Sequence, residues 1–353
     1  MRHEGLRAGI AGCSGYAGGE LVRLLAMHPQ VQITLLTSRT YAGKTMDAVF
    51  PGFAGLDLPV VEVFDPATAA SRVDVLFTAT ENGYAMQHAR ALLDAGVRVI
   101  DISADFRLRD PDVYSQWYRM PHADIGLLQE AVYGLPELTD RAYIASARLV
   151  ANPGCYPTAA ALALAPAVEA GLVRTDNLLI DAKSGVSGAG RSKFGLPYHF
   201  AELNEGMKAY GVPSHRHTPE IEQTLSGVAH GSPVRLTFSP SLAPITRGIL
   251  CCAYADLVKP LSAAELTEVY RTRYGNERFI TVREPGDFPS TKATYGVNQC
   301  QMAVTVDERT NRMIAVSVID NLVKGAAGQA VQNMNIMFGF PESEALDLPA
   351  VYP

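Results

Sequence analysis

The sequence predicts an α/β protein in which a doubly wound, mostly parallel sheet is followed by an α+β domain with a mostly antiparallel or mixed sheet. Three observations carry this prediction. The chain has 353 residues, which favours two domains at ~150 residues each. Short apolar runs alternate with helix-like segments up to about residue 150, as in parallel sheets. Beyond Ala151, long strand-like runs outnumber the helical segments.

The first half begins as a strand–helix–strand unit. The apolar run Leu6–Ala11 precedes a glycine-rich turn, Glu20–Ala26 has the leucine spacing of a helix face, and Val31–Leu36 returns to strand composition. The crossover of such a unit is right-handed. The other elements expected in this half are strands at 60–64, 73–78 and 97–102 and a helix over 84–95.

The second half has a different pattern. A helix is expected over Thr158–Ala170, and Gly325–Met337 is a second helical segment, which we expect to pack back on the first domain. We therefore expect a first domain of residues 1–150, completed by residues 324–353, and a second domain of residues 151–323. The strands expected in the second domain lie at 178–182, 234–238, 248–255 and 313–319.

Charge and composition exclude several classes of protein. The 30 Lys and Arg residues stand against 36 Asp and Glu residues, a formal net charge of -6, so no global basic field is present to hold nucleic acid or a membrane. Met1–Arg7 is charged and no run of ~18 apolar residues occurs, so we expect a cytoplasmic protein. Five cysteines without CxxC spacing favour reduced thiols and predict no metal site.

A glycine-rich loop lies between the first strand and the first helix. Residues 9–19 read GIAGCSGYAGG, with the spacing Gly12-x-x-Gly15-x-x-Gly18. Glycines at such a turn let backbone N–H groups approach a pyrophosphate at the helix N-terminus. The loop therefore predicts a dinucleotide site, and the alternative is a turn that serves only tight packing.

The end of the second strand indicates which dinucleotide binds. An NAD site has an Asp or Glu there, to bind the ribose 2′-hydroxyl, whereas this chain has Thr37, Ser38 and Arg39. A hydroxyl and a guanidinium suit a 2′-phosphate, which a carboxylate would repel. NADP(H) is therefore favoured over NAD(H), unless Arg39 is only a solvated charge.

One cysteine stands out as a candidate nucleophile. Cys155 lies in the segment Asn152–Thr158, directly before the apolar helix, with Pro157 suited to a first helical turn. The positive end of the helix dipole lowers a thiol pKa and favours the nucleophilic thiolate. The alternative is a buried structural cysteine, as expected for the other thiols, which are Cys13, Cys251, Cys252 and Cys300.

A histidine pair could supply the acid/base group that a thiolate needs. His215 and His217 would point to the same side of an extended segment, Thr218 is placed to cap the helix that follows, and Glu220 or Glu222 could orient an imidazole. The same pair could be half of a metal site, but no compact third ligand is near it.

Two segments combine groups that bind anions. Lys183–Arg191 contains two hydroxyls, three glycines and the Arg191 guanidinium after a predicted strand. The segment Asp101–Arg107 ends a strand of the parallel sheet, where α/β proteins bind ligands, so Arg107 is a second candidate. Each arginine alone could be a solvated loop charge. Together with a thiol and an imidazole, they indicate a small, doubly anionic substrate.

These motifs resemble those of a known family. In them the chain is similar to the N-acetyl-gamma-glutamyl-phosphate reductases of arginine biosynthesis, within the wider fold group of aspartate-semialdehyde dehydrogenase. The resemblance rests on motifs in the same order over essentially the whole chain, which are Gly12–Leu21, Thr37–Arg39, Ser103–Leu108, Tyr133–Leu138, Asn152–Thr158, Ser184–Arg191, His215–Ile221 and Asp320–Ala330.

The resemblance implies a Rossmann-type NADP-binding domain and a catalytic domain that also forms an oligomer, a dimer or tetramer. It implies Cys155 as nucleophile, His217 or His215 as acid/base, and Asn321 near the nicotinamide. The residues expected at the cofactor are Gly12, Ser14, Gly15, Tyr16, Gly18, Ser38, Arg39, Ser184, Gly185, Gly188 and Asn321. Those expected at the substrate are Arg107, Asn152, Arg191 and Glu220.

The sequence departs from the family at one loop. After the fourth predicted strand the family usually has Ala-Leu-Pro-His-Gly, whereas this chain has Ala79-Thr-Glu-Asn-Gly83, so no role is carried over to Glu81 or Asn82.

The expected activity is the NADPH-dependent reduction of N-acetyl-gamma-glutamyl phosphate to N-acetylglutamate semialdehyde through a cysteine thioester. Three alternatives stay open. They are a reductase of a related acyl phosphate such as aminoadipyl phosphate, an enzyme that oxidises a free aldehyde, and a non-catalytic protein that senses NADP.

Overall fold

The computed structural model describes residues 5–352 and divides the chain into two compact units. The first unit holds the described residues up to Pro153, with Gly190–Ser192 and Ala326–Leu348. The second unit holds Gly154–Ala189, Lys193–Gly325 and the residues from Pro349 on. The predicted charged start of the chain falls mainly on residues 1–4, outside the described residues. Within residues 5–352, no helix is long and apolar enough to span a membrane.

The first unit contains a six-stranded sheet in which every neighbouring pair is parallel. The strand order is β2-β1-β3-β4-β6-β5, so the predicted doubly wound sheet is confirmed. The strands are β1 (Leu6–Ala11), β2 (Val31–Thr37), β3 (Val75–Thr78), β4 (Arg98–Asp101), β5 (Val132–Tyr133) and β6 (Leu149–Ala151).

The register brings the carboxyl ends of these strands into line. Ala11 pairs with Thr37 and Thr78, Thr78 pairs with Asp101, and Asp101 pairs with Ala151. Ligands bind at this edge of an open α/β sheet. The predicted site segments that begin at Gly12, Thr37, Asp101 and Asn152 start at one of these strand ends or one residue after it.

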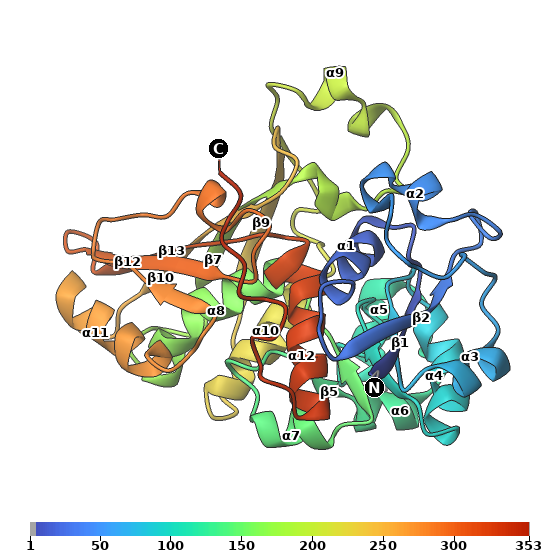
Figure 1. The fold of residues 1–353 in the computed structure, drawn as a ribbon. Coiled ribbons are helices and arrows are strands. Elements are labelled where there is room, and N and C mark those ends of the chain that lie inside the picture. Colours follow the sequence, from blue (N-terminus) through green and yellow to red (C-terminus); the bar gives the residue numbers. More distant parts are fainter. Residues whose placement is uncertain (1–4, 353) are drawn as a thin grey trace. The chain divides into compact units, whose positions relative to one another are not determined.

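Helices cover both faces of this sheet, as the chain order requires. The crossover from β1 to β2 and that from β3 to β4 run in opposite directions, so right-handed connections place their helices on opposite faces. Accordingly α1 (Tyr16–Leu25) packs against α12 (Gly328–Phe338), whereas α3 (Pro66–Arg72) packs against α4 (Tyr84–Asp94). Figure 1 shows the C-terminal helix α12 beside α1.

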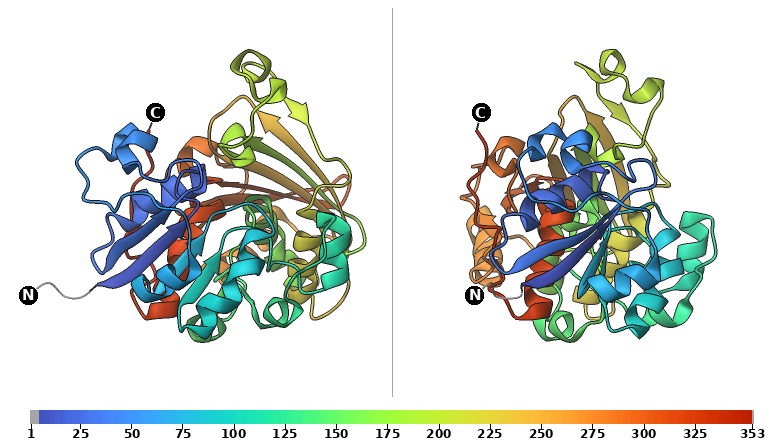
Figure 2. Two further views of the ribbon diagram at one scale, coloured as in Figure 1. Left: turned by 90° about the vertical axis from the view of Figure 1, so that its right-hand side faces the viewer. Right: turned by 45° about the vertical axis from the view of Figure 1, so that its right-hand side comes forward.

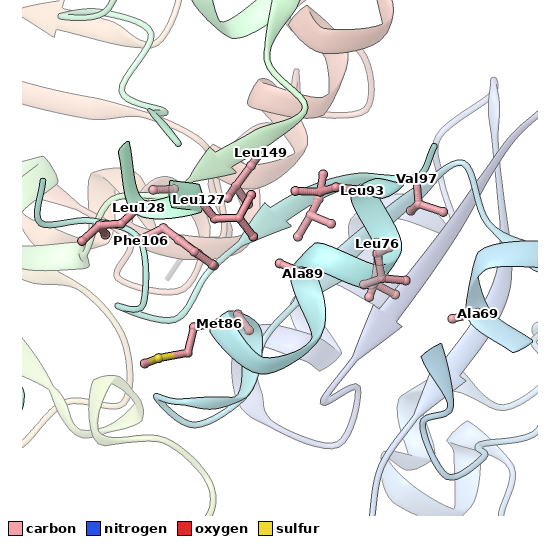
Figure 3. Close-up of a cluster of buried hydrophobic side chains, with 14 of the residues drawn as sticks. Ala69, Leu76, Met86, Ala89, Leu93, Val97, Phe106, Leu127, Leu128 and Leu149 are labelled. Carbon is pink, nitrogen blue, oxygen red and sulfur yellow. The ribbon is translucent and has the colours of Figure 1, made fainter. Parts of the chain in front are cut away.

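The core on the α4 face is a single cluster of buried side chains (Figure 3). Leu76 from β3, Leu93 from α4 and Leu149 from β6 contribute to it and are at most 4% exposed. Phe106, which follows β4, and Leu127, which lies in the helix α6 (Ile125–Glu130), complete the cluster. The motif Asp101–Arg107 is thereby fixed to the sheet on its apolar side.

The predicted strand at 60–64 is wrong. Only Glu62 forms an isolated bridge, to Thr37 of β2. Val60 and Val63 are 48% and 66% exposed, and the backbone N–H and carbonyl of the buried Val61 bond the loop residues Lys44 and Gly43 rather than a neighbouring strand. Helices that the sequence reading did not predict are α2 (Met46–Val49), α3, α5 (Pro111–Tyr118), α6 (Ile125–Glu130) and α7 (Arg141–Ser146).

The second unit contains a seven-stranded mixed sheet with the order β11-β12-β13-β10-β7-β9-β8. Four of its neighbouring pairs are antiparallel and two, β11 with β12 and β7 with β9, are parallel. The predicted mixed sheet is therefore confirmed. The strands are β7 (Leu178–Gly185), β8 (Lys208–Ala209), β9 (Leu236–Ala243), β10 (Ile249–Asp256), β11 (Ile280–Val282), β12 (Cys300–Asp307) and β13 (Arg312–Ile319).

The helix α8 (Cys155–Glu169) packs on this sheet and is buried almost throughout. Pro166 lies inside it and lacks the N–H that would bond the carbonyl of Leu162. The hydroxyl of Tyr274, on α11 (Ala263–Tyr274), donates to that carbonyl at 2.8 Å. A side chain thus replaces the missing backbone donor and ties α11 to α8.

The segment between β7 and α10 (Thr218–Val228) contains α9 (Phe200–Leu203) and extends beyond the edge of the seven-stranded sheet (Figure 2). Phe194 and Phe200 in this segment are 90% and 79% exposed. The predicted helix at 325–337 begins in a π-helical turn, Val323–Ala327, which leads into α12.

Candidate active site

The glycine-rich loop is tied to the strand ends on either side of it. Gly12 has a φ of 84°, a conformation that favours glycine, and an added Cβ would lie 2.3 Å from the carbonyl oxygen of Ala79. The N–H groups of Gly12 and Cys13 both donate to the carbonyl of Thr37, at 2.9 and 3.1 Å. The loop therefore has one fixed path between β2 and β3.

The helix α1 begins directly behind this loop, at Tyr16 rather than at the predicted Glu20. Gly15 precedes it in an extended conformation, and no side chain caps the helix. An added Cβ on Gly18 would lie 2.2 Å from the carbonyl oxygen of Gly12, so only glycine fits there. At Gly15 the nearest such atom is 3.5 Å away. The uncapped helix start and the open Gly15 fit a pyrophosphate.

The predicted 2′-phosphate residues lie beside the loop. The hydroxyl groups of Ser14 and Ser38 are 2.8 Å apart, and Ser38 is 8% exposed. The exposed Arg39 guanidinium forms an ion pair with the carboxylate of Glu81. No role is carried over to Glu81, because its loop departs from the family pattern, and its partner Arg39 is 42 residues away in the sequence.

Arg191 belongs to the first unit and contacts the nucleotide loop. Its guanidinium donates to the carbonyl of Ser14 at 3.0 Å and to that of Val49 at 3.3 Å. It also lies over the rings of Phe50 and Tyr41, 4.4 and 5.5 Å from their centroids. This position beside the cofactor loop differs from the substrate role that the sequence predicts for it.

Arg107 and Asn152 are buried and hydrogen-bonded to the backbone. Nε of Arg107 donates to the carbonyl of Asn152 at 2.8 Å and Nη2 donates to that of Ile102 at 2.7 Å. The Asn152 amide donates to the carbonyl of Ala326 and accepts from the amide of Asn333, both at 3.1 Å. The Arg107 side chain therefore holds the ends of β4 and β6 together.

Cys155 is the first residue of α8, three residues earlier than the sequence predicts. Two glycines, Gly154 and Gly325, lie next to it. The N–H of Gly154 donates to Oε1 of Glu220 at 2.9 Å, which fixes the chain before the thiol. A Cβ on Gly325 would lie 2.8 Å from Cβ of Cys155. The sulfur sits at the positive end of a 15-residue helix, a position that favours the thiolate.

The two histidines lie together beside this helix start, with ring centroids 4.8 Å apart. They share one side because of a turn, not an extended segment, in which Nδ1 of His215 accepts the N–H of His217 at 3.1 Å. The expected cap is also wrong. His217 is the N-cap of α10, and Thr218 is its first residue.

His215 stays neutral at physiological pH. Burial, and next the charge of Arg216, lower its pKa to about 4. Aromatic rings pack against it, with the centroids of Tyr156, Tyr210 and Phe238 at 5.2 to 5.6 Å. No local sequence pattern indicates this aromatic enclosure, because its members come from α8, β9 and the segment before α10.

The hydroxyl groups of Tyr156 and Tyr210 form a buried chain next to Cys155. Tyr210 donates to Tyr156 at 2.9 Å, and Tyr156 donates to the carbonyl of Ser241 at 3.3 Å. Burial raises the pKa of both phenols. Both groups are therefore neutral hydrogen-bonding groups that fix the residue after the thiol.

The predicted anion loop after β7 is held by Asn321. Its amide accepts the N–H of Gly248 at 2.7 Å and donates to the hydroxyl of Ser187 at 2.9 Å. Ser184 is 1% exposed and donates to the carbonyl of Gly185. A Cβ on Gly188 would lie 3.0 Å from the Ser184 hydroxyl. These residues form one packed turn within the second unit.

Two other thiols have the character of packing residues. Burial raises the pKa of Cys13 to about 12 and also raises that of Cys251. Among residues 5–352 no group of three or more His, Cys, Asp or Glu side chains could hold a metal ion.

Comparisons with known proteins agree with this fold. The sequence model of the semialdehyde dehydrogenase NAD binding domain matches residues 7–147, and that of the semialdehyde dehydrogenase dimerisation domain matches residues 155–321. The fold and these matches define a semialdehyde dehydrogenase.

Curated relatives narrow this class. The chain is 50% identical to the N-acetyl-gamma-glutamyl-phosphate reductase of Desulforamulus reducens, over 99% of this chain and 100% of that protein. It is 51% identical to the same reductase of Symbiobacterium thermophilum, over 99% of both chains. The chain belongs to the N-acetyl-gamma-glutamyl-phosphate reductase family.

Solved structures agree on the fold. Aspartate semialdehyde dehydrogenase II of Vibrio cholerae has a TM-score of 0.72 at 18% identity, covering 95% of this chain and 99% of that chain. The aspartate semialdehyde dehydrogenase of Candida albicans, solved with NADP, has a TM-score of 0.69 at 17% identity, covering 95% and 98%.

Proposed function

We propose that this protein reduces N-acetyl-gamma-glutamyl phosphate to N-acetylglutamate semialdehyde with NADPH, as a step of arginine biosynthesis. The observation that carries this proposal is Cys155 at the start of α8, with the histidine pair directly before the neighbouring α10. The names of relatives at about 50% identity support the choice of substrate.

The first unit would hold the cofactor. The turn from Gly12 to Gly18 and the uncapped start of α1 would bind its pyrophosphate, and Ser38 and Arg39 would bind its 2′-phosphate. Arg191 would keep the loop in place through the Ser14 carbonyl. NADPH, when bound, supplies the hydride that reduces the acyl carbon.

Cys155 performs the covalent step. Its thiolate forms a bond to the acyl carbon, the bond from that carbon to the phosphate oxygen breaks, and inorganic phosphate leaves with the electron pair. The product is a thioester, whose carbonyl accepts a hydride where a carboxylate would not. After reduction, the carbon–sulfur bond breaks, which releases the aldehyde and restores the thiolate. Backbone N–H groups at the start of α8 would stabilise the oxyanion.

His217 is the proposed acid/base group. It takes the proton from the Cys155 sulfur, gives it to the carbonyl oxygen during reduction, and takes it back as the aldehyde forms. His215 does not fill this role, since its pKa of about 4 leaves it without a proton to give at neutral pH. It instead accepts the N–H of His217 and so orients that residue.

Three predicted substrate residues are proposed to position the site. Glu220 holds Gly154 before the thiol, and Arg107 and Asn152 hold the strand ends that lead to it. Their buried hydrogen bonds to the backbone support this role.

The test is NADPH oxidation with N-acetyl-gamma-glutamyl phosphate. Wild type is expected to require the acyl phosphate, and Cys155→Ser to lose turnover but keep NADPH binding. Cys252→Ser removes a half-buried thiol of β10 and serves as the matched control. Full activity in Cys155→Ser would exclude the mechanism.

The reverse reaction separates the alternatives. With NADP⁺ and N-acetylglutamate semialdehyde, turnover is expected to require phosphate. Turnover without phosphate would indicate a free-aldehyde oxidase, preference for a longer semialdehyde would indicate an aminoadipyl substrate, and NADP binding without turnover would indicate a sensor.

We further propose a homo-oligomer, a dimer or tetramer, because the second unit matches a domain described as a dimerisation domain. A cytoplasmic location is proposed because a thiolate nucleophile and NADPH both need a reducing compartment. Light scattering of the purified chain tests the first proposal.

A further inference from the structure

The Arg39–Glu81 ion pair joins the two loops that flank the nucleotide turn. Arg39 follows β2 and Glu81 follows β3, and these strands lie on either side of β1. The side chains are 75% and 62% exposed, so both are accessible to a ligand. The Arg39 guanidinium, which is predicted to bind a 2′-phosphate, is therefore already paired with the Glu81 carboxylate.

The position of Glu81 is fixed by its neighbours in the loop. The amide of Asn82 accepts the N–H of Ala104 at 3.2 Å, and the N–H of Gly83 donates to the carboxylate of Asp105 at 2.7 Å. Asp105 is fully buried. The turn that carries Glu81 is therefore anchored to the segment after β4, which places the Glu81 backbone within side-chain reach of Arg39.

This arrangement affects the two dinucleotides differently. A 2′-phosphate carries about −1.5 to −2 charges, so it must share Arg39 with Glu81 or displace it, against repulsion between like charges. The 2′-hydroxyl of NAD(H) has no such conflict, and a carboxylate is the group that accepts it in NAD-binding sites.

We propose that Glu81 is a cofactor-selectivity residue that competes with the 2′-phosphate for Arg39 and so narrows the preference for NADP(H) over NAD(H). The inference rests on the proposed function only in assigning the nucleotide site. Arg39 favours NADP(H) over NAD(H), and Glu81 reduces this difference in affinity.

The test is the ratio of the dissociation constants of NADH and NADPH, measured by titrating the intact protein with each reduced cofactor and following its fluorescence. Glu81→Gln keeps the size of the side chain and removes its charge. At high dielectric the lost repulsion gives an increase in this ratio of about 5-fold, which high salt diminishes. NADH affinity is expected to fall slightly or stay constant.

Glu130→Gln is the matched control. Glu130 is a paired surface carboxylate of the same unit, bonded to Arg148 next to the amino end of β6, at the opposite edge of the sheet. It is expected to leave the ratio unchanged, whereas Arg39→Met is expected to remove most of the NADPH preference.

Three outcomes would overturn the inference. These are an unchanged ratio in Glu81→Gln, a lower ratio, or an equal rise in Glu130→Gln, which would indicate only a net-charge effect. Each leaves the proposed function intact if NADPH binds. A wild-type protein that binds neither cofactor would instead overturn the proposed function and this inference together.

Discussion

The substitution Gly325→Ala tests how strictly the fold positions the Cys155 thiol. A Cβ at this position would lie 2.8 Å from Cβ and 3.2 Å from Cα of Cys155, whereas ordinary contacts begin at 3.4 Å. Gly325→Ala therefore requires a movement of about 0.6 Å. A displacement of 1 Å in a reacting group costs about 100-fold in rate. We expect kcat to fall about 10-fold, with little change in NADPH affinity.

The assay is steady-state NADPH oxidation at saturating acyl phosphate, with the urea midpoint measured in parallel. Gly227→Ala is the control, because Gly227 lies in α10 of the same unit and an added Cβ meets no atom within 4 Å. It is expected to keep kcat and to gain up to about 1 kcal/mol of stability from helix propensity. Wild-type kcat in a folded Gly325→Ala protein would refute the reasoning.

Three further predictions concern the histidines and the nucleotide turn. His217→Asn is expected to lower kcat by about 10²- to 10⁴-fold and His215→Phe by less than about 10-fold. Because the pKa of His215 is lowered to about 4, the unfolded chain binds its proton first as pH falls, so stability falls from pH 6.5 toward pH 4. The free energy of unfolding of His215→Phe, measured by urea denaturation, is expected to fall less steeply than that of wild type in that window, by up to about 1.4 kcal/mol per pH unit. Equal slopes would contradict this. Gly18→Ala is expected to weaken NADPH binding at least about 10-fold, because its Cβ would lie 2.2 Å from the Gly12 carbonyl oxygen, whereas Gly15→Ala is expected to fold normally. Unchanged NADPH affinity in Gly18→Ala would contradict this.

Short-range patterns in the sequence, such as an apolar run followed by glycines, predicted strands that end at the carboxyl edge of the parallel sheet. The strand Leu6–Ala11 was predicted with the bounds that the structure gives, because an apolar run ends abruptly at a glycine-rich turn. The strand β12 was not predicted, although Cys300–Asp307 alternates Cys, Met and Val with Gln, Ala, Thr and Asp. In the structure it pairs antiparallel with β13 over its whole length.

Contacts distant in sequence explain the rest. The sequence indicated Cys155 and the histidine pair as site residues, but the burial that lowers the pKa of His215 depends on aromatic rings from three segments. In the same way, Arg39 is visible as a strand-end guanidinium, whereas its partner Glu81 is 42 residues away. Propensity and spacing carry no information on such pairs.

The central claim, that Cys155 forms a thioester, is tested most directly by intact-protein mass spectrometry. The protein would be mixed with N-acetyl-gamma-glutamyl phosphate in the absence of NADPH, while released phosphate is counted. We predict one N-acetylglutamyl group per chain on Cys155, one phosphate released with it, and loss of the adduct on adding NADPH. An adduct of the same mass in Cys155→Ser, or turnover by a wild-type enzyme that never carries the group, would contradict the account.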